Sequence, residues 1–502
     1  MLRNQTPYLA VVISVTALYV ALAIGSALTE TPMIDEGMFA SPGLNLATKG
    51  FMGTTVLEPS GSALKNINQR TYWVMPLHLM NQAFWYKVFG FSLFSMRSLS
   101  IFWGVIALLS WLLIMNFLTE NKTVALLGFV LIAFDYHFIR TAAVGRMDMM
   151  SAALGFAALA AYLSLRERNF AGAILASQSL VVASGLTHFM GTLPFVGLLF
   201  ITLYFDRRRI KPRHLAVAAI PYLVGAVGYG LYIVKDFPAY RAQFIDNAMM
   251  GGRLSGVSSP ISNLLREFTE RYPAGFGFGE HTAGHSGPIY LKGLILFSYA
   301  IGILGVTLSP SLNRIKGHRA LLILTLIYFL IMSLLDGQKQ TNYLIHIVPF
   351  YAAILAIWVH WCWTHRMLPA SFIGLCFCGV LTLQIGGVLY RIKQNSYQKE
   401  YIPVINFLKE HTGPTTSIVG SSALGFGLGY RTNFVDDPRF GTTNGKRADV
   451  IVFGQENEQG MKMYPELYQD VTNLLAEEYV QVYSTGAYKI YSRQVRQAPA
   501  NR

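Results

Sequence analysis

The sequence predicts an α-helical polytopic membrane protein with a small α/β domain at its C-terminal end. Of its 502 residues, 53% are hydrophobic and only 13% are charged, whereas soluble domains carry about 25% charged residues. The mean hydropathy is +0.40. Apolar runs long enough to cross a bilayer recur as far as residue 389, and residues 396–502 no longer have that character.

About eleven apolar runs are expected to form transmembrane helices, because each approaches or reaches the length that crosses a bilayer. The first run is longer than the core of a signal peptide, so we expect an uncleaved anchor. The predicted spans are 6–28, 98–118, 123–140, 148–165, 170–187, 189–205, 214–234, 290–308, 319–335, 343–363 and 369–389. Residues 1–395 are therefore expected to form a membrane domain, with outer loops at 29–97 and 235–289.

Basic residues are distributed unevenly over the loops between these spans. With the N-terminus in the cytoplasm, the cytoplasmic segments hold Arg3, Lys122, Arg166, Arg168, Arg207, Arg208, Arg209, Lys211, Arg213, Arg314, Lys316, Arg319 and Arg366, and the short outer loops hold Arg140, Arg146 and Lys339. Because Lys and Arg favour cytoplasmic loops, we expect a cytoplasmic N-terminus and an extracytoplasmic C-terminal domain. The same rule accounts for the net charge of +14, so no nucleic-acid partner is expected.

Residues 396–502 are expected to form the extracytoplasmic α/β domain. The expected elements are a helix at 402–411, strands at 417–419 and 449–453, a helix at 464–478 and a hairpin at 480–491. A further helix within 72–94 mixes aromatic and polar side chains, which favours a position in the membrane interface.

Two acidic motifs lie at the edges of predicted spans. Asp35 and Glu36 follow the first span by a few residues, and Asp148 opens the fourth. Carboxylates at this depth are costly unless a site uses them. The structural alternatives are that Asp35 caps a short helix and that Asp148 only pairs with Arg140 or Arg146. The predicted topology places both motifs on the outer face, which favours one shared site.

These motifs, with residues that follow them, resemble the protein O-mannosyltransferase and lipid A aminoarabinose transferase superfamily. The further matches are Pro76 at the interfacial helix, Arg97 at the start of the second span, and Lys339 and Tyr343 in a segment that ends at Pro349. His188 stands in a tight outer turn where bacterial relatives often carry lysine. The resemblance covers about residues 1–390 and implies a membrane fold of the GT-C type.

The resemblance implies inverting transfer of a monosaccharide from a polyprenyl-phosphate carrier at the outer membrane face. The attacking hydroxyl must lose a proton, which a carboxylate base accepts. Asp35 would be this base, Glu36 would shape the site, and Asp148 would orient loops or bind the sugar or acceptor. The expected substrate-binding residues are Arg97, Lys339, Arg146, His188 and Tyr343, with Arg97 and Lys339 at the carrier phosphate.

The expected partners are the carrier lipid, the bilayer and an acceptor hydroxyl or phosphate on lipid A, another glycan, a lipid or a protein. The expected location is the cell membrane, which is the inner membrane in a bacterium. No cofactor or metal is expected, since glycines and a proline around His281 and His285 argue against a helix that would align them. The alternatives are a polymerase or ligase with a diphosphate carrier, and a lipid-linked sugar transporter, for which broken helices and mid-membrane charges are typical.

Overall fold

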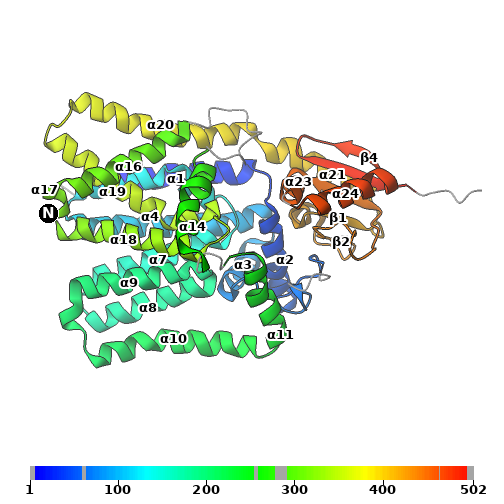
Figure 1. Cartoon of the computed structure of the whole chain (residues 1–502), viewed down its shortest axis with the longest axis horizontal. Helices are drawn as coiled ribbons and strands as arrows, with labels where there is room; N and C mark the ends of the chain where they lie inside the picture. Colours follow the sequence, from blue (N-terminus) through cyan, green and yellow to red (C-terminus); the bar gives the residue numbers. More distant parts are fainter. Residues whose placement is uncertain (1–5, 59–63, 254–257, 278–290, 463, 495–502) are drawn as a thin grey trace, which may run out of the picture.

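The computed structural model describes residues 6–58, 64–253, 258–277, 291–462 and 464–494. Within them, long helices form a bundle, and a small domain of strands and short helices caps one end of it (Figure 1). The loop helix α17 (Pro310–Asn313), beside the basic residues near 314–319, lies at the opposite end of the bundle. The loop at α17 and the C-terminal domain thus lie at opposite ends of the bundle (Figure 1).

Eight helices of the described chain are long and apolar enough to cross a membrane, and one bent pair makes a ninth candidate. Two shorter apolar helices, α16 and α19, occupy the remaining predicted positions. The bundle helices are α1 (Thr6–Thr29), α4 (Leu93–Thr119), α5 (Lys122–Ala133), α6 (Tyr136–Ala142), α7 (Met147–Leu165), α8 (Phe170–Thr187), α9 (Thr192–Asp206), α10 (Pro212–Ile233), α16 (Lys292–Leu308), α18 (Lys316–Leu335), α19 (Val348–Thr364) and α20 (Ala370–Gln394).

The predicted span 123–140 corresponds to a bent pair of helices, because α5 and α6 meet at an angle of 59°. Asp135 stands at the break and caps α6, accepting a hydrogen bond from Phe138 N at 2.9 Å. Its other oxygen accepts from Tyr299 Oη at 2.7 Å and from Gln384 Nε2 at 2.8 Å. A broken helix with a buried carboxylate is typical of transporters. Here, however, protein donors bond to both oxygens of Asp135, so Asp135 has a structural role.

The core of the bundle is aromatic and tightly packed. Trp111 is completely buried and makes edge contacts with Phe156 and Phe350, with ring centroids 5.2 and 4.7 Å apart. In contrast, α10 exposes large apolar side chains such as Leu223 and Val227. An outward apolar face is what a helix next to lipid requires, because hydrocarbon offers no partners to polar groups.

Two helices lie between the bundle and the small domain. They are α2 (Ile34–Lys49), which sequence reasoning foresaw only as a short capped helix, and α3 (Pro76–Phe89), which fulfils the expectation for 72–94. Gly50 and Gly90 end them with φ of 77° and 79°, a left-handed conformation that glycine adopts without strain. Shorter helices on the same side are α11 (Phe237–Tyr240), α12 (Asn247–Met250), α14 (Pro260–Arg266) and α15 (Tyr272–Gly275), with π-helical turns at Arg241–Asp246, Glu267–Arg271 and Tyr397–Tyr401 and 3-10 turns at η3 (Phe189–Gly191) and η9 (Thr341–His346). The 3-10 turn η4 (Arg207–Arg209) lies at the other end of α9, before α10.

The C-terminal domain has a five-stranded sheet in the order β2-β1-β3-β5-β4. Strands β1 and β2 and strands β1 and β3 pair in parallel, whereas β3, β5 and β4 pair antiparallel. The elements are α21 (Ile402–His411), β1 (Ile418–Gly420), η11 (Ser422–Leu424), α22 (Gly425–Leu428), β2 (Phe434–Val435), β3 (Val450–Gly454), α23 (Gln455–Lys462), α24 (Pro465–Glu478), β4 (Tyr479–Ser484) and β5 (Tyr488–Arg493). Sequence reasoning found all of these except η11, α22, β2 and α23, which are short.

The C-terminal domain packs directly on α2. The Ser422 hydroxyl donates to Ile34 O at 3.0 Å, and the Tyr430 hydroxyl donates to Gly37 O at 3.1 Å. A Cβ on Gly37 would overlap the backbone of Ser422. The helix that carries the first acidic motif is therefore held between the bundle and the C-terminal domain.

Candidate active site

The first acidic motif lies in the first turn of α2. Glu36 Oε2 accepts a hydrogen bond from Met33 N at 2.9 Å, which satisfies one free amide at the helix start. The positive end of the helix dipole also stabilises the two carboxylates in this turn. Glu36 is completely buried, whereas the side chain of Asp35 is 39% exposed. The two neighbouring acids therefore have different surroundings, and only Asp35 is open to a substrate.

Glu36 holds together three segments of the bundle. Its two oxygens accept from Arg97 Nε at 2.8 Å and Arg97 Nη2 at 2.7 Å. The oxygen bound to Nε also accepts from Gly145 N at 2.8 Å, in the turn before α7. Fork-shaped pairing of this kind fixes geometry as well as charge.

The remaining N–H groups of Arg97 also bond to the protein. Nη1 donates to Ala27 O at 2.7 Å and to Glu30 O at 2.8 Å, and Nη2 donates to Thr31 O at 3.1 Å. A guanidinium has five N–H donors, and these contacts use all of them in a side chain that is 1% exposed. The expected contact of Arg97 with a carrier phosphate therefore does not fit this geometry.

Arg146 joins the two acidic motifs. Its Nη1 forms an ion pair with Asp35 Oδ2, and its Nε bonds to Asp148 Oδ2 at 2.8 Å. Its guanidinium lies 5.9 Å from the centre of the Phe39 ring. One guanidinium thus bridges a half-exposed carboxylate on α2 and a fully buried one on α7, which places the motifs in one site as the topology predicts.

Asp148 lies among neutral polar rings. It interacts electrostatically with His78, His188 and His346, and the His188 ring lies 5.1 Å from the Tyr343 ring. Burial lowers the pKa of His188 to about 3 and the pKa values of His78 and His346 to about 4. These rings are uncharged near neutral pH, so His188 cannot replace a phosphate-binding lysine as a cation.

Several buried atoms of this cluster lack a hydrogen-bond partner within the described chain. They are His78 Nδ1, Asp148 Oδ1, His188 Nε2 and His346 Nε2. Their residues are between 0 and 2% exposed, and leaving such atoms unpaired costs about 1–3 kcal/mol each. The cluster is therefore suited to a small polar ligand that supplies hydroxyl groups.

Lys339 belongs to a different, charge-balanced cluster. Its Nζ donates to Glu267 Oε1 at 2.8 Å and to Ser333 O at 2.9 Å, and the residue is 4% exposed. Arg271 pairs with the same Glu267 at 3.1 Å and with Asp336 at 2.9 Å. Two cations meet two carboxylates here, so Lys339 holds the loop before η9 and does not offer a free charge to a phosphate.

Sequence reasoning missed a positively charged cluster near Glu30, which we call the Glu30 cluster. Arg391 Nη2 bonds to Glu30 Oε2 at 2.8 Å, and Arg391 Nη1 donates to the Tyr136 hydroxyl at 2.9 Å. Lys292 Nζ lies 3.9 Å from the centre of the Tyr136 ring. Burial by itself raises the pKa of Glu30, but Arg391 and Arg140 outweigh it and hold that pKa below its usual value. Within the described chain, three cations thus lie near Glu30, and Arg140 also interacts with Glu456, so the cluster keeps a surplus of positive charge.

The only sequence signal for the Glu30 cluster is the position of its members at the ends of predicted spans, which lipid-facing arginines and lysines share. Its convergence from four helical segments needs the fold. Among the described residues, no group of three or more His, Cys, Asp or Glu side chains is placed to hold a metal ion. His281 and His285 lie outside those residues.

Comparisons with known proteins identify the fold. No family model matches the sequence, and no curated protein is significantly similar to it. A solved structure of ArnT from Cupriavidus metallidurans bound to undecaprenyl phosphate superposes with a TM-score of 0.63 and 14% identity, covering 97% of this chain and 98% of ArnT. The Archaeoglobus fulgidus oligosaccharyltransferase AglB, in complex with an inhibitory peptide and a dolichol-phosphate, gives 0.56 and 14%, covering 99% of this chain and 75% of AglB. The chain has the GT-C fold.

The expected fold class is therefore confirmed, and the apolar helices belong to a multi-pass membrane protein. The similarity extends over the C-terminal domain too, since nearly all of this chain is covered in both comparisons. At 14% identity the likeness shows the fold alone, so the chemistry must be argued from this chain's own residues.

Proposed function

We propose that this protein is a membrane glycosyltransferase that moves a sugar from a polyprenyl-phosphate carrier to an acceptor, with inversion at the anomeric carbon. One observation carries the proposal: Arg146 brings the half-exposed Asp35 and the buried Asp148 into one site. Those residues lie where α2 and α7 begin, at the end of the bundle that faces the C-terminal domain. A lipid-anchored donor needs a site at such a boundary, because its tail stays in the bilayer.

Asp35 is the proposed general base. Its Oδ2 is paired with Arg146, and within the described chain its carboxylate has no other partner, so Oδ1 is free to take a proton. The acceptor oxygen loses its proton to Asp35 and forms a bond to the anomeric carbon, while the bond from that carbon to the phosphate oxygen breaks. The transition state resembles an oxocarbenium ion, which nearby carboxylates stabilise.

The Glu30 cluster is the proposed site for the departing carrier phosphate. As the bond breaks, the electron pair goes to the phosphate oxygen and the leaving group gains negative charge. Cationic groups held in place before the reaction stabilise such charge. Arg140, Lys292 and Arg391 supply such cationic groups around Glu30. In contrast, Arg97 and Lys339 are already neutralised by protein carboxylates. Arg97 and Lys339 then act as positioning residues.

The polar cluster around Asp148 is the proposed binding site for sugar or acceptor hydroxyls. His188 Nδ1 accepts a hydrogen bond from Met190 N at 3.3 Å, so its Nε2 carries the proton and donates to a ligand. The Nε2 of His346 is also unpaired within the described chain, and Asp148 Oδ1 accepts a hydrogen bond. Tyr343 would pack its ring against the bound group beside His188. Hydroxyl groups would satisfy the buried atoms that the protein itself leaves unpaired.

The test is turnover by the purified full-length protein in lipid nanodiscs. The donors are polyprenyl-phosphate mannose, polyprenyl-phosphate glucose and a polyprenyl-diphosphate oligosaccharide, and mass spectrometry measures the released carrier and the modified acceptor. We expect release of polyprenyl phosphate from a monosaccharide donor. Release from the diphosphate donor alone would favour the oligosaccharide ligase, and unchanged lipids and surface glycans in cells with and without the chain would refute the proposal.

The proposed orientation has a cytoplasmic N-terminus and an outer C-terminal domain in the cell membrane. The basic cluster from Arg207 to Arg213 supports it. A reporter fused after residue 210 should be cytoplasmic and one fused near residue 400 should be outside. Finding both on the same side would contradict the eleven-span topology.

A further inference from the structure

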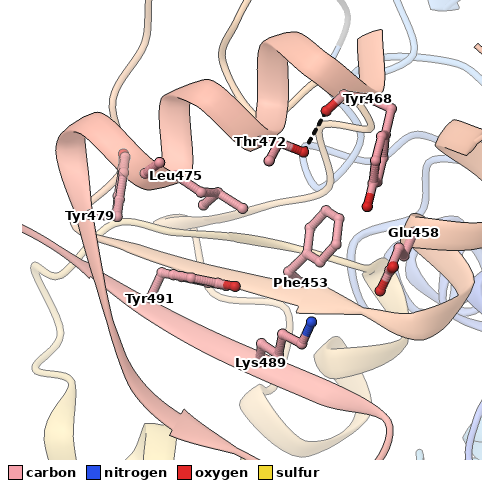
Figure 2. Close-up of a pocket in the computed structure, with 9 residues that line it drawn as sticks. Phe453, Glu458, Tyr468, Thr472, Leu475, Tyr479, Lys489 and Tyr491 are labelled. Atoms are coloured by element: carbon pink, nitrogen blue, oxygen red, sulfur yellow. Dashed lines mark hydrogen bonds between the residues drawn. The ribbon is translucent and has the colours of Figure 1, made fainter. Parts of the chain in front are cut away.

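The C-terminal domain contains a cavity that takes no part in the proposed chemistry. Its volume is about 350 Å³, and it lies between α24 on one side and strands β3 and β5 on the other (Figure 2). The residues that line it include Phe453, Glu458, Tyr468, Thr472, Leu475, Tyr479, Lys489 and Tyr491. Pockets for small ligands begin at about 300 Å³, so this cavity is large enough for one sugar ring.

The short helix α23 separates this cavity from the proposed active site. Glu456 Oε2 accepts from Ile34 N at 3.3 Å, next to Asp35. Glu458 comes two residues later on the same helix and lines the cavity. Residues two apart on an α-helix point about 200° away from each other, so Glu456 and Glu458 face opposite sides. A ligand in the cavity would therefore sit behind α23 and leave the active site free.

Aromatic rings form the apolar walls. Phe453 is buried at the base, and Tyr468 and Tyr491 flank it as half-buried rings from α24 and β5 (Figure 2). Tyr479 is fixed by a hydrogen bond from its hydroxyl to Ala448 O at 2.8 Å. Aromatic side chains have few rotatable bonds, so they give a rigid contact surface at small entropic cost.

Polar groups point into the same space. Lys462 pairs with Glu458 at 2.9 Å, and this hydrogen bond lowers the pKa of Glu458, so the carboxylate is charged at neutral pH. Within the described chain, neither Lys489 Nζ nor the Tyr491 hydroxyl has a hydrogen-bond partner. The cavity thus offers a carboxylate acceptor, an ammonium donor and a phenol beside an apolar wall.

This combination matches a sugar ring better than it matches a purely apolar ligand. One face of a pyranose carries C–H groups that pack on an aromatic ring, and its edge carries hydroxyls that need donors and acceptors. A purely apolar ligand would leave Glu458 and Lys489 desolvated. We propose that this cavity binds a neutral pyranose unit of a glycan outside the catalytic site.

The experiment uses the full-length protein in nanodiscs and saturation-transfer difference NMR with methyl glycosides of mannose, glucose and galactose. Binding of at least one sugar in the millimolar range is expected. Tyr491→Ala and Lys489→Met should each weaken it about tenfold, since each removes one main contact. The controls Tyr464→Ala and Lys409→Met change exposed residues of the same domain that do not line the cavity, and they should bind like the parent.

The outcomes separate the pocket from the active site and from misfolding. Thermal unfolding curves like the parent's must accompany any loss of binding, and Lys489→Met changes only an exposed side chain. Loss in both cavity variants, with binding kept in Asp35→Asn, supports the proposal. Absence of binding by the parent at tens of millimolar sugar, or equal binding by the parent and both cavity variants, would overturn it. Neither result depends on whether the protein transfers sugar.

Discussion

Arg97 and Glu36 form a two-pronged ion pair that is completely buried, although the residues are 61 positions apart in the sequence. The pair ties the first turn of α4 to the start of α2, and it leaves Arg97 with no free N–H. Both residues stand in motifs that resemble catalytic and phosphate-binding positions. The pair shows how one such motif supports the site by holding its neighbour Asp35 in place.

Arg97→Ala should therefore lower stability more than it changes donor affinity. Removing one partner of a buried ion pair costs about 3–5 kcal/mol, because the other charge remains buried and unpaired. Thermal unfolding in detergent would measure the loss. The double variant Glu36→Gln/Arg97→Met should recover part of it, since no charge is then stranded. If the variant instead had a parent-like melting curve and a raised KM for the donor, Arg97 would be a residue that binds the carrier phosphate.

The second prediction concerns the base. Asp35→Asn keeps size and most hydrogen bonding but cannot accept a proton at neutral pH, so turnover should fall about 10²–10⁴-fold. Asp35 is 39% exposed, and its replacement should leave the unfolding temperature nearly unchanged. Initial rates with a purified polyprenyl-phosphate sugar would measure the effect.

A matched control is Asp470→Asn, which changes an exposed carboxylate on α24 and should not alter the rate. Asp148→Asn offers a second comparison, because that carboxylate is buried against Arg146 and its loss should lower stability as well as turnover. Near-normal turnover by Asp35→Asn would remove it as the base and make Asp148 the candidate.

The spans were predictable because an apolar run of about 20 residues is a local signal. The break within 123–140 was not, since the groups that stabilise Asp135 lie 164 and 249 residues away. Similarly, the sequence order and charge bias placed Asp35 and Asp148 on one face, and the sequence suggested a pair of Asp148 with Arg146. It gave no sign that Arg146 also pairs with Asp35. Side-chain partners of this kind depend on packing between distant helices.

The proposed phosphate contacts were harder to predict for the same reason. Arg97 and Lys339 stand at plausible positions along the chain, but the folded structure pairs them with Glu36 and Glu267. Lys292 resembles any lysine at the end of a span in the sequence. The distances between cations and carboxylates in the folded chain decide which cations keep a free charge. The sequence does not give those distances.

The third prediction concerns the Glu30 cluster. Lys292→Met removes one of the three cations near Glu30, so donor binding and rate should both fall, with kcat/KM reduced about 100-fold. Arg140→Met should act in the same direction. Varying the concentration of polyprenyl-phosphate sugar would separate KM from kcat. Lys87→Met on α3 removes an exposed cation outside the cluster and serves as the control. Parent-like kinetics in both cluster variants would exclude the cluster as the phosphate site.

The fourth prediction concerns pH. Burial raises the pKa of Asp436 from 3.8 to about 6, and this residue joins the C-terminal domain to the outer loop through a bond from its N–H to Val56 O at 2.7 Å. A carboxyl whose folded pKa exceeds its unfolded pKa binds its proton more tightly in the folded state. Its contribution to stability is therefore lost as the pH rises from about 4 to about 6.

Asp436→Asn should remove that dependence. The stability of the variant relative to the parent should increase by about 1.4 kcal/mol for each pH unit between the two pKa values, and then level off above about pH 6. The amide oxygen can still accept from Ser422 N, as the carboxylate does at 2.6 Å. Unfolding curves at pH 4.5 and 7.5 would measure the change. An equal difference at both pH values would show that Asp436 does not titrate in this range.

The last prediction tests whether the C-terminal domain must stay seated on α2. A Cβ at Gly37 would overlap backbone atoms of Ser422 and Ala423, and backbone on both sides cannot move aside as a flexible side chain can. Gly37→Ala should therefore displace the domain from the helix that carries Asp35. We expect faster proteolysis between the bundle and the domain, together with a loss of transfer. The control Gly228→Ala lies on α10 where a Cβ meets nothing within 4 Å, and an added methyl there should stabilise the helix slightly. If Gly37→Ala kept parent-like proteolysis and turnover, close contact between α2 and the C-terminal domain would not be required for the site, and the domain would act independently of catalysis.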